Sequence, residues 1–140
     1  MTTKTMTLKT AESLLRHVRL ELARDPDFPE GSRERGYEFV APIDAKGHLV
    51  AEAWKLTRER CRVRRFWPHA PREVGHVVHK AGGQAGGTWA FHYDIQGDPA
   101  HDETGFRLDT HSFAPGEYIS IKEQDGAVRT FRVTAVSKLT

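Results

Sequence analysis

The chain has little cysteine, no long apolar run and only a small net charge. Its 140 residues include one cysteine, Cys61, which excludes an internal disulfide. The first ten residues, MTTKTMTLKT, contain no apolar stretch of the kind that a signal sequence or a membrane span needs, so we expect a cytoplasmic protein with no membrane partner. The formal net charge of +2 is too small to indicate nucleic-acid binding by itself. The placement of the charges therefore matters more than their sum.

The composition is polar but compatible with a folded domain. Hydrophobic residues make up 38% of the chain and charged residues 29%, and the aromatic residues comprise three Trp, seven Phe and three Tyr. A chain of this length buries roughly two thirds of its unfolded surface when it folds as one domain. Bulky aromatic side chains contribute most per residue to that burial. We therefore expect an aromatic-rich core.

The clearest structural pattern is a β-hairpin in residues 111–136, HSFAPGEYISIKEQDGAVRTFRVTAV. Hydrophobic and polar residues alternate on both arms with the period of two that half-buried strands show. A three-residue loop over residues 124–126 places Ile119 opposite Phe131, whereas a two-residue loop would mix the two faces. Gly126 then takes the left-handed position of the turn.

A second hairpin is predicted for residues 74–80 and 88–94, which flank the glycine-rich loop AGGQAGG. If that loop is centred near Gln84, His76 lies opposite His92. The aromatic residues of the second arm then face small residues on the first arm, which favours packing.

Short strands and two helices complete the predicted fold. Strands are predicted for residues 36–43, 61–67 and 105–108. Residues 49–59 fit either a short helix or a strand that returns from a turn, and we choose the helix. Thr10 is the predicted N-cap of an amphipathic helix that Pro26 ends. Its apolar stripe consists of Ala11, Leu14, Leu15, Val18 and Leu22.

Together these elements predict a mainly β protein. We expect a small antiparallel barrel or a strongly bent sheet, with the N-terminal amphipathic helix over an open end or face. Residues 1–35 form the N-terminal helix and linker and residues 36–140 the β domain, within a single compact domain. An α+β arrangement would require both predicted helices to pack on one face of a sheet.

The strings GYEFVAP, RRFW, WAFHYD, FAPGEYISI and TFRV together are similar to a family of short uncharacterised bacterial proteins. This resemblance covers most of residues 36–136 and implies a self-contained small domain, without an activity or functional residues to carry over. Residues 113–118 also resemble the FxPGQY string of the flavin-binding barrel in ferredoxin reductase-type proteins, with Glu117 in place of Gln. Residues 129–132 lack the Tyr and Ser of that family's R-x-Y-S motif. The cofactor therefore stays unknown.

The strongest candidate binding surface is the basic run KLTRERCRVRR at residues 55–65. On a strand, Arg60, Arg62 and Arg64 project from one face at intervals of about 6.6 Å, close to the phosphate spacing of an extended nucleic acid strand. Aromatic neighbours of the run can stack bases: Trp54, Phe66 and Trp67. This pattern predicts contact with single-stranded nucleic acid or another anionic ligand. The alternative is a solvated strand face that the acidic residues 98–103 partly neutralise.

The histidines suggest a second kind of site. His76 and His92 are predicted neighbours across two strands, and His111 or Asp94 would supply a third ligand, which leaves a position for the water of a catalytic zinc site. Ordinary surface or hydrogen-bonded histidines are the alternative. Cys61 faces the core on the strand interpretation and has no identified base, so we expect an inert buried thiol.

We therefore predict a non-catalytic binding or interaction module that uses the basic face of Arg60, Arg62 and Arg64. The alternative is a small metal-dependent enzyme centred on the histidines. A third prediction is a homo-oligomer, in which an exposed strand edge or the apolar stripe of the N-terminal helix pairs with a second copy.

Overall fold

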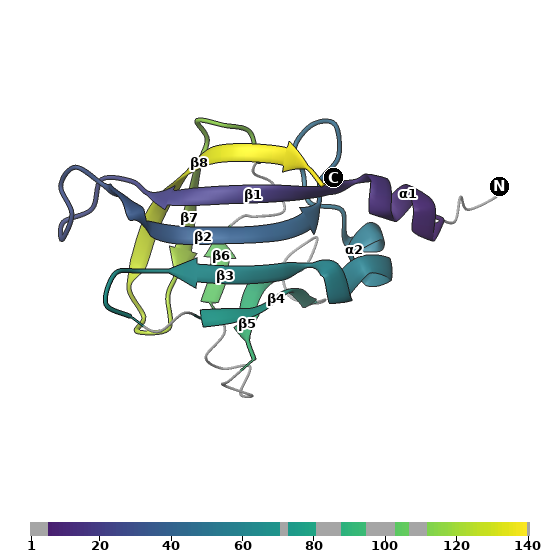
Figure 1. Ribbon diagram of the computed structural model, residues 1–140. Coiled ribbons are helices and arrows are strands. Elements are labelled where there is room, and N and C mark those ends of the chain that lie inside the picture. Colours follow the sequence, from purple (N-terminus) through teal and green to yellow (C-terminus); the bar gives the residue numbers. More distant parts are fainter. Residues whose placement is uncertain (1–5, 71–72, 81–87, 95–102, 107–111, 140) are drawn as a thin grey trace.

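The computed structural model describes residues 6–70, 73–80, 88–94, 103–106 and 112–139. Within these ranges the chain forms eight strands and three helical segments (Figure 1). The helical segments are α1 (Leu8–Ser13), α2 (Ala51–Thr57) and the 3₁₀ helix η1 (Arg58–Arg60). The strands are β1 (Leu15–Leu22), β2 (Ser32–Pro42), β3 (Arg62–Phe66), β4 (Glu73–Lys80), β5 (Thr88–Tyr93), β6 (Glu103–Phe106), β7 (Tyr118–Lys122) and β8 (Val128–Lys138).

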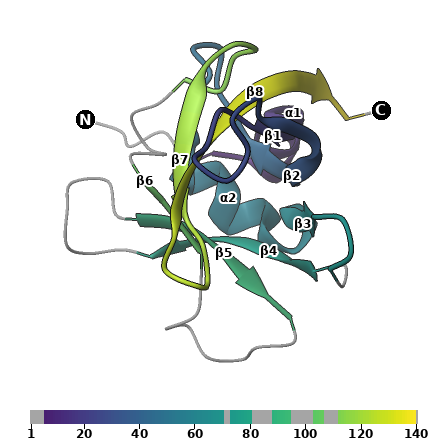
Figure 2. The same ribbon diagram turned by 90° about the vertical axis from the view of Figure 1, so that its left-hand side faces the viewer.

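The strands pair in chain order and close into one antiparallel barrel. Each strand is hydrogen-bonded to the next, and β8 returns to pair with β1. Figure 2 shows the strands around the barrel, with α2 beyond them. The prediction of a mainly β protein with a small antiparallel barrel is confirmed. Every described strand has a neighbour on both sides over at least part of its length, so none of them is an edge strand throughout. The homo-oligomer stays a prediction.

The N-terminal segment differs from its predicted structure. An N-terminal helix is present, but α1 ends at Ser13, and the residues from Leu15 onward form β1. Val18, Leu20 and Leu22 are buried alternately, so a strand period coexists with the helical spacing in the same residues. The strand prevails because β1 forms ladders with both β2 and β8. The barrel therefore begins at Leu15, well before residue 36, and most of the predicted docking stripe lies in the core.

Both predicted hairpins are confirmed with their registers. In the β7–β8 hairpin, Ile119 lies opposite Phe131 and Gly126 has a φ of 88°. In the β4–β5 hairpin, His76 lies opposite His92. The AGGQAGG loop of that hairpin lies outside the described residues.

Inward-facing apolar side chains fill the barrel, as the period of two requires. The core is rich in aromatic rings: the centroid of the Tyr37 ring lies 5.1 Å from that of Phe91 and 5.0 Å from that of Phe131. All three rings are at most 2% exposed. Figure 1 separates two ends of the barrel. We term the end beside α1 and α2 the helix end, and the opposite end, with the β1–β2 loop and the β7–β8 turn, the hairpin end.

Helix α2 packs at the helix end, which confirms the helix predicted for residues 49–59. Its Trp54 is 7% exposed and donates from Nε1 to the carbonyl oxygen of Val77 at 2.7 Å. The Trp54 ring meets the Trp89 ring edge to face, with centroids 6.1 Å apart. Within the described ranges, neither helix is long and apolar enough to cross a membrane.

Candidate functional site

The predicted row of three arginines is split by the local structure. Arg62 and Arg64 lie in β3 on either side of the buried Val63, whereas Arg60 lies in η1, because the strand begins only at Arg62. We term the outward side of β3, with Arg62 and Arg64, the β3 arginine face. Each of the three arginines pairs with a carboxylate from another element. The distances are 2.8 Å from Arg60 to Glu12, 3.0 Å from Arg62 to Asp94 and 2.9 Å from Arg64 to Glu38.

A small hollow of about 230 Å³ lies on the β3 arginine face. Outward side chains of β1 to β4 line it, among them Arg62, Arg64 and Glu38. The Arg64 guanidinium also lies 5.4 Å from the centroid of the Phe66 ring. Of the three aromatic residues predicted to accompany the arginines, only Phe66 lies beside Arg64. Trp54 is buried in the core, and the centroid of the Trp67 ring lies 4.2 Å from the Arg65 guanidinium. The surface carries charges of both signs, because Glu38 accepts hydrogen bonds from Arg64 and from Arg19.

The histidines are brought together only in part. Besides its place opposite His92, His76 has Nδ1 3.3 Å from Asp94 Oδ1 and Nε2 2.8 Å from the Arg62 guanidinium. Among the residues that the structure describes, no three His, Cys, Asp or Glu side chains are grouped to hold a metal ion. His111, the predicted third ligand, lies outside the described residues.

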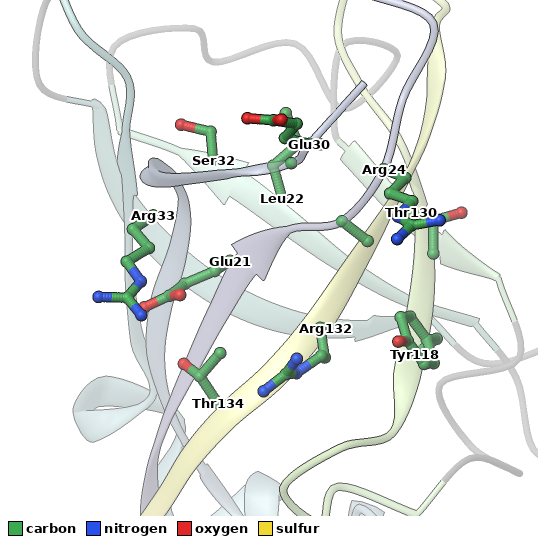
Figure 3. A pocket seen from close by; sticks show the side chains of 12 residues that line it. Glu21, Leu22, Arg24, Glu30, Ser32, Arg33, Tyr118, Thr130, Arg132 and Thr134 are labelled. Carbon is green, nitrogen blue, oxygen red and sulfur yellow. The ribbon is translucent and has the colours of Figure 1, made fainter. Parts of the chain in front are cut away.

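A larger groove of about 1050 Å³ lies on the outer surface towards the hairpin end. Residues of β1 and β8 form its floor, and residues from the start of β2 and from β7 flank it (Figure 3). We term it the outer groove. Its lining residues are Glu21, Leu22, Ala23, Arg24, Glu30, Gly31, Ser32, Arg33, Tyr118, Thr130, Arg132 and Thr134. None of them belongs to a site predicted from the sequence.

Two irregularities in the strand pairing shape the outer groove. On the β2 side of β1, the register passes from Gly36 directly to Ser32 and skips the residues from Arg33 to Arg35. On the β8 side of β1, the register skips Thr134. Such bulges bend a strand and redirect its side chains. The skipped Arg33 and Thr134 both line the groove, and the alternation of residue types gives no sign of either shift.

The outer groove carries arginines without acidic partners. Among the described residues, no carboxylate lies within ion-pair distance of Arg24, Arg33 or Arg132, and all three side chains are exposed. Glu21 and Glu30 also line the groove, but Glu21 already accepts from Arg19 Nε at 2.8 Å. The groove therefore has an excess of positive charge, whereas the arginines of the β3 arginine face are paired.

A charged cluster fills the hairpin end of the barrel. The Glu123 side chain is 4% exposed and accepts from the Tyr37 hydroxyl at 2.6 Å and from Nε of Arg65 and of Arg129, both at 3.1 Å. Arg129 also pairs with Asp25 at 2.7 Å. Burial alone lowers the pKa of Arg129, but the surrounding carboxylates outweigh burial and raise that pKa. Because its charges are matched and shielded from solvent, we assign this cluster to stability rather than to ligand binding.

The sequence contains a signal for this cluster. Glu123 is in phase with the buried Ile121, Arg129 is in phase with the buried Phe131, and Arg65 continues the buried face of β3. A charged residue in phase with an apolar strand face points inward. Glu123 and Arg129 have opposite signs on adjacent arms of a hairpin, which predicts that they pair. Arg65 reaches Glu123 from β3, which is adjacent to neither arm.

Cys61 is fully buried, as predicted. Burial raises the pKa of its thiol to about 11, and Sγ donates to the carbonyl oxygen of Thr57 at 3.4 Å. The thiol is therefore protonated at neutral pH and is a poor nucleophile.

Comparisons with protein-family models, with curated proteins and with solved structures found no match. Both resemblances noted in the sequence therefore stay expectations. In the FAPGEY string, Gly116 has a φ of 96° and Tyr118 is 54% exposed at the start of β7. The turn thus accounts for the glycine without a flavin.

Proposed function

We propose that the protein is a non-catalytic binding module for an anionic partner, and that the β3 arginine face contacts single-stranded nucleic acid. One observation carries this proposal: Arg62 and Arg64 lie two positions apart on one side of β3 and line a common hollow. The Phe66 ring lies beside Arg64, with the guanidinium of Arg19 at 4.4 Å and that of Arg64 at 5.4 Å from its centroid. Cationic side chains track a phosphate backbone and aromatic rings stack bases in single-strand binders.

The existing ion pairs are weak obstacles to such binding. The side chains of Arg62 and Asp94 are 47% and 42% exposed, and those of Arg64 and Glu38 are 33% and 22% exposed. Pairs at this exposure contribute about 0–1 kcal/mol each. A polyanion also gains free energy from the release of its counterions. Phosphates can therefore replace Asp94 and Glu38 at small cost.

Charge reversal tests the proposal. We expect Arg60→Glu, Arg62→Glu and Arg64→Glu together to weaken the salt-sensitive binding of a fluorescently labelled single-stranded oligonucleotide about tenfold or more. A matched control changes the net charge equally at three exposed lysines outside the basic run of residues 55–65: Lys9→Glu, Lys46→Glu and Lys138→Glu. The control should keep most of the binding.

A second set of variants guards against misfolding. Because a glutamate at position 64 would lie beside Glu38, the same three arginines are also changed to glutamine. The thermal midpoint of every variant is measured by circular dichroism. Unchanged oligonucleotide binding in a folded variant would contradict the proposal.

A small metal-dependent enzyme is the second candidate function. Its support is the position of His76 opposite His92, with Asp94 3.3 Å from His76. A catalytic zinc site needs three protein ligands and a water. Because His76, His92 and Asp94 are not grouped to hold a metal ion, this candidate depends on His111 as a further ligand. Thermal melting with Zn²⁺, Mn²⁺ or Ni²⁺ tests it. A rise in Tm that disappears in His92→Ala supports the site, and no rise with any of the three ions removes it.

A further inference from the structure

We propose that the outer groove is a separate binding site for a nucleoside phosphate, with the phosphate at Arg132 and the base on the ring of Tyr118. This site shares no residue with the β3 arginine face. The shared ligand chemistry is a phosphate ester that carries an aromatic base, whether as a free nucleotide or within a single-stranded nucleic acid.

The charge of the groove favours a phosphate. Its arginines, Arg24, Arg33 and Arg132, are exposed and hold no carboxylate within the part of the chain that the structure describes. A guanidinium with free N–H donors binds a phosphate through two parallel hydrogen bonds. By contrast, a ligand at Arg62 or Arg64 must first displace a carboxylate. The groove arginines can therefore bind an anion without first releasing a carboxylate.

Arg132 occupies the centre of the site. In the strand ladders it lies opposite Glu21 of β1 and opposite Tyr118 of β7. Thr130 and Thr134 lie two positions away on either side of it in β8 and also line the groove. Figure 3 shows Arg132 between these residues, with Arg24 near the Thr130 end and Arg33 on the opposite side. A phosphate bound at Arg132 therefore has a second arginine towards each end of the groove, Arg24 on one side and Arg33 on the other.

Tyr118 supplies the aromatic surface. It is 54% exposed, although large aromatic side chains are usually buried, and it lies on the strand next to Arg132. Base stacking needs such a ring with one face open beside a cation. The volume of about 1050 Å³ exceeds what a lone phosphate requires and accommodates a ligand of nucleotide size.

The bulges explain why the site exists on a barrel wall. An unbroken ladder presents a flat outer face, whereas the skipped residues of β2 and β8 place Arg33 and Thr134 at the groove. Bulges of this kind commonly redirect side chains beside binding sites. The groove is therefore a feature of the backbone and is present before any ligand arrives.

Fluorescence anisotropy with a labelled single-stranded oligonucleotide tests the inference. Four variants are compared with the wild-type chain: the groove variant Arg24→Gln/Arg33→Gln/Arg132→Gln, the face variant Arg62→Gln/Arg64→Gln, Tyr118→Leu and Glu30→Gln. Unlabelled competitors are a nucleoside monophosphate, a nucleoside and inorganic phosphate. Circular dichroism checks that each variant is folded. We expect the groove variant to be as stable as wild type, because its arginines form no ion pair with the residues that the structure describes.

We expect the groove variant to weaken binding about tenfold or more at low salt, and Tyr118→Leu to weaken it about tenfold. Glu30→Gln should strengthen binding, because it removes a negative charge from the groove. Competition by the monophosphate but not by the nucleoside identifies the phosphate as essential. If the monophosphate competes as well as an unlabelled oligonucleotide, the natural ligand is a free nucleotide. If the monophosphate competes much more weakly than the oligonucleotide, the ligand is a nucleic acid.

Other outcomes overturn the inference, the proposed function or both. If the face variant loses binding while the groove variant keeps it, the groove site is wrong and the proposed function stands. If the groove variant loses binding while the face variant keeps it, the groove is right and the β3 arginine face is not the contact surface. If inorganic phosphate competes as well as the monophosphate, the base is not recognised and the role of Tyr118 is wrong. If the wild-type chain binds none of these probes, both proposals fail.

Discussion

Removal of the Glu123 carboxylate should strongly destabilise the barrel. This side chain accepts hydrogen bonds from Tyr37, Arg65 and Arg129 at 2.6, 3.1 and 3.1 Å and is 4% exposed. In Glu123→Ala, all three donors lose their acceptor in a place that water reaches poorly. Arg65 and Arg129 then stay charged with one carboxylate fewer to neutralise them.

The expected loss can be bounded from the remaining contacts. Breaking a buried ion pair from one side costs about 3–5 kcal/mol. Arg129 retains Asp25 at 2.7 Å, and Arg65 retains Glu73 at 3.7 Å. The free energy of unfolding should therefore fall by about 3 kcal/mol, at the lower end of that range. Tyr37→Phe removes a single donor and should cost about 1–2 kcal/mol.

Urea denaturation, followed by tryptophan fluorescence and by circular dichroism, measures these losses. Glu117→Ala is the matched control, because Glu117 is an exposed carboxylate in the turn before β7. Its free energy of unfolding should change by less than about 0.5 kcal/mol. If Glu123→Ala is no less stable than Glu117→Ala, the reasoning about the buried cluster is refuted.

Two further predictions concern the core. Gly36→Ala should lower the free energy of unfolding by about 1–3 kcal/mol in urea denaturation, because its Cβ would lie 1.9 Å from the carbonyl oxygen of Leu20; a change within experimental error would contradict that close approach. Burial raises the pKa of the Cys61 thiol from 9.0 to about 11. The protonated thiol therefore stabilises the folded state below pH 9.0. This contribution is lost as the pH rises towards 11, because the unfolded chain releases the proton first. The difference in unfolding free energy between the wild-type chain and Cys61→Ala should shrink by at most about 3 kcal/mol over that interval, and parallel pH profiles of the two chains would show that the thiol is not the cause.

The hairpins were predictable because their determinants are local. Gly126 takes a left-handed conformation that few other residues adopt, and the resulting loop length sets the pairing of Ile119 with Phe131. In the other hairpin, the packing of aromatic residues against small ones favoured the register that pairs His76 with His92. Turn chemistry and side-chain pairing lie within a few residues of each other in these segments, so no distant part of the chain was needed.

Residues 15–22 were not predictable in this way. Their apolar residues satisfy a helical spacing and, from Val18 onward, also a strand period. The choice depends on partners far along the chain: Leu20 lies opposite Tyr37 on one side and Val133 on the other. Local propensity cannot decide between two periods when the hydrogen-bonding partners are remote.

The candidate sites show the same difference between local and distant determinants. The outward direction of Arg62 and Arg64 followed from the period of β3, but their carboxylate partners did not, because those come from β2 and from the residue after β5. The outer groove depends on two bulges opposite β1, and a bulge leaves no regular trace in the pattern of residue types. Its arginines therefore looked like ordinary surface charges.

The salt dependence of oligonucleotide binding by the wild-type chain decides whether the barrel binds polyanions. We expect binding at low salt that weakens linearly on logarithmic scales, with a slope of about −0.7 for each phosphate contacted. The control with three reversed lysines should retain this slope, and reversal of Arg60, Arg62 and Arg64 should reduce it. A chain that binds no oligonucleotide at low salt, or binds it independently of salt, would contradict an anion-binding function for this barrel.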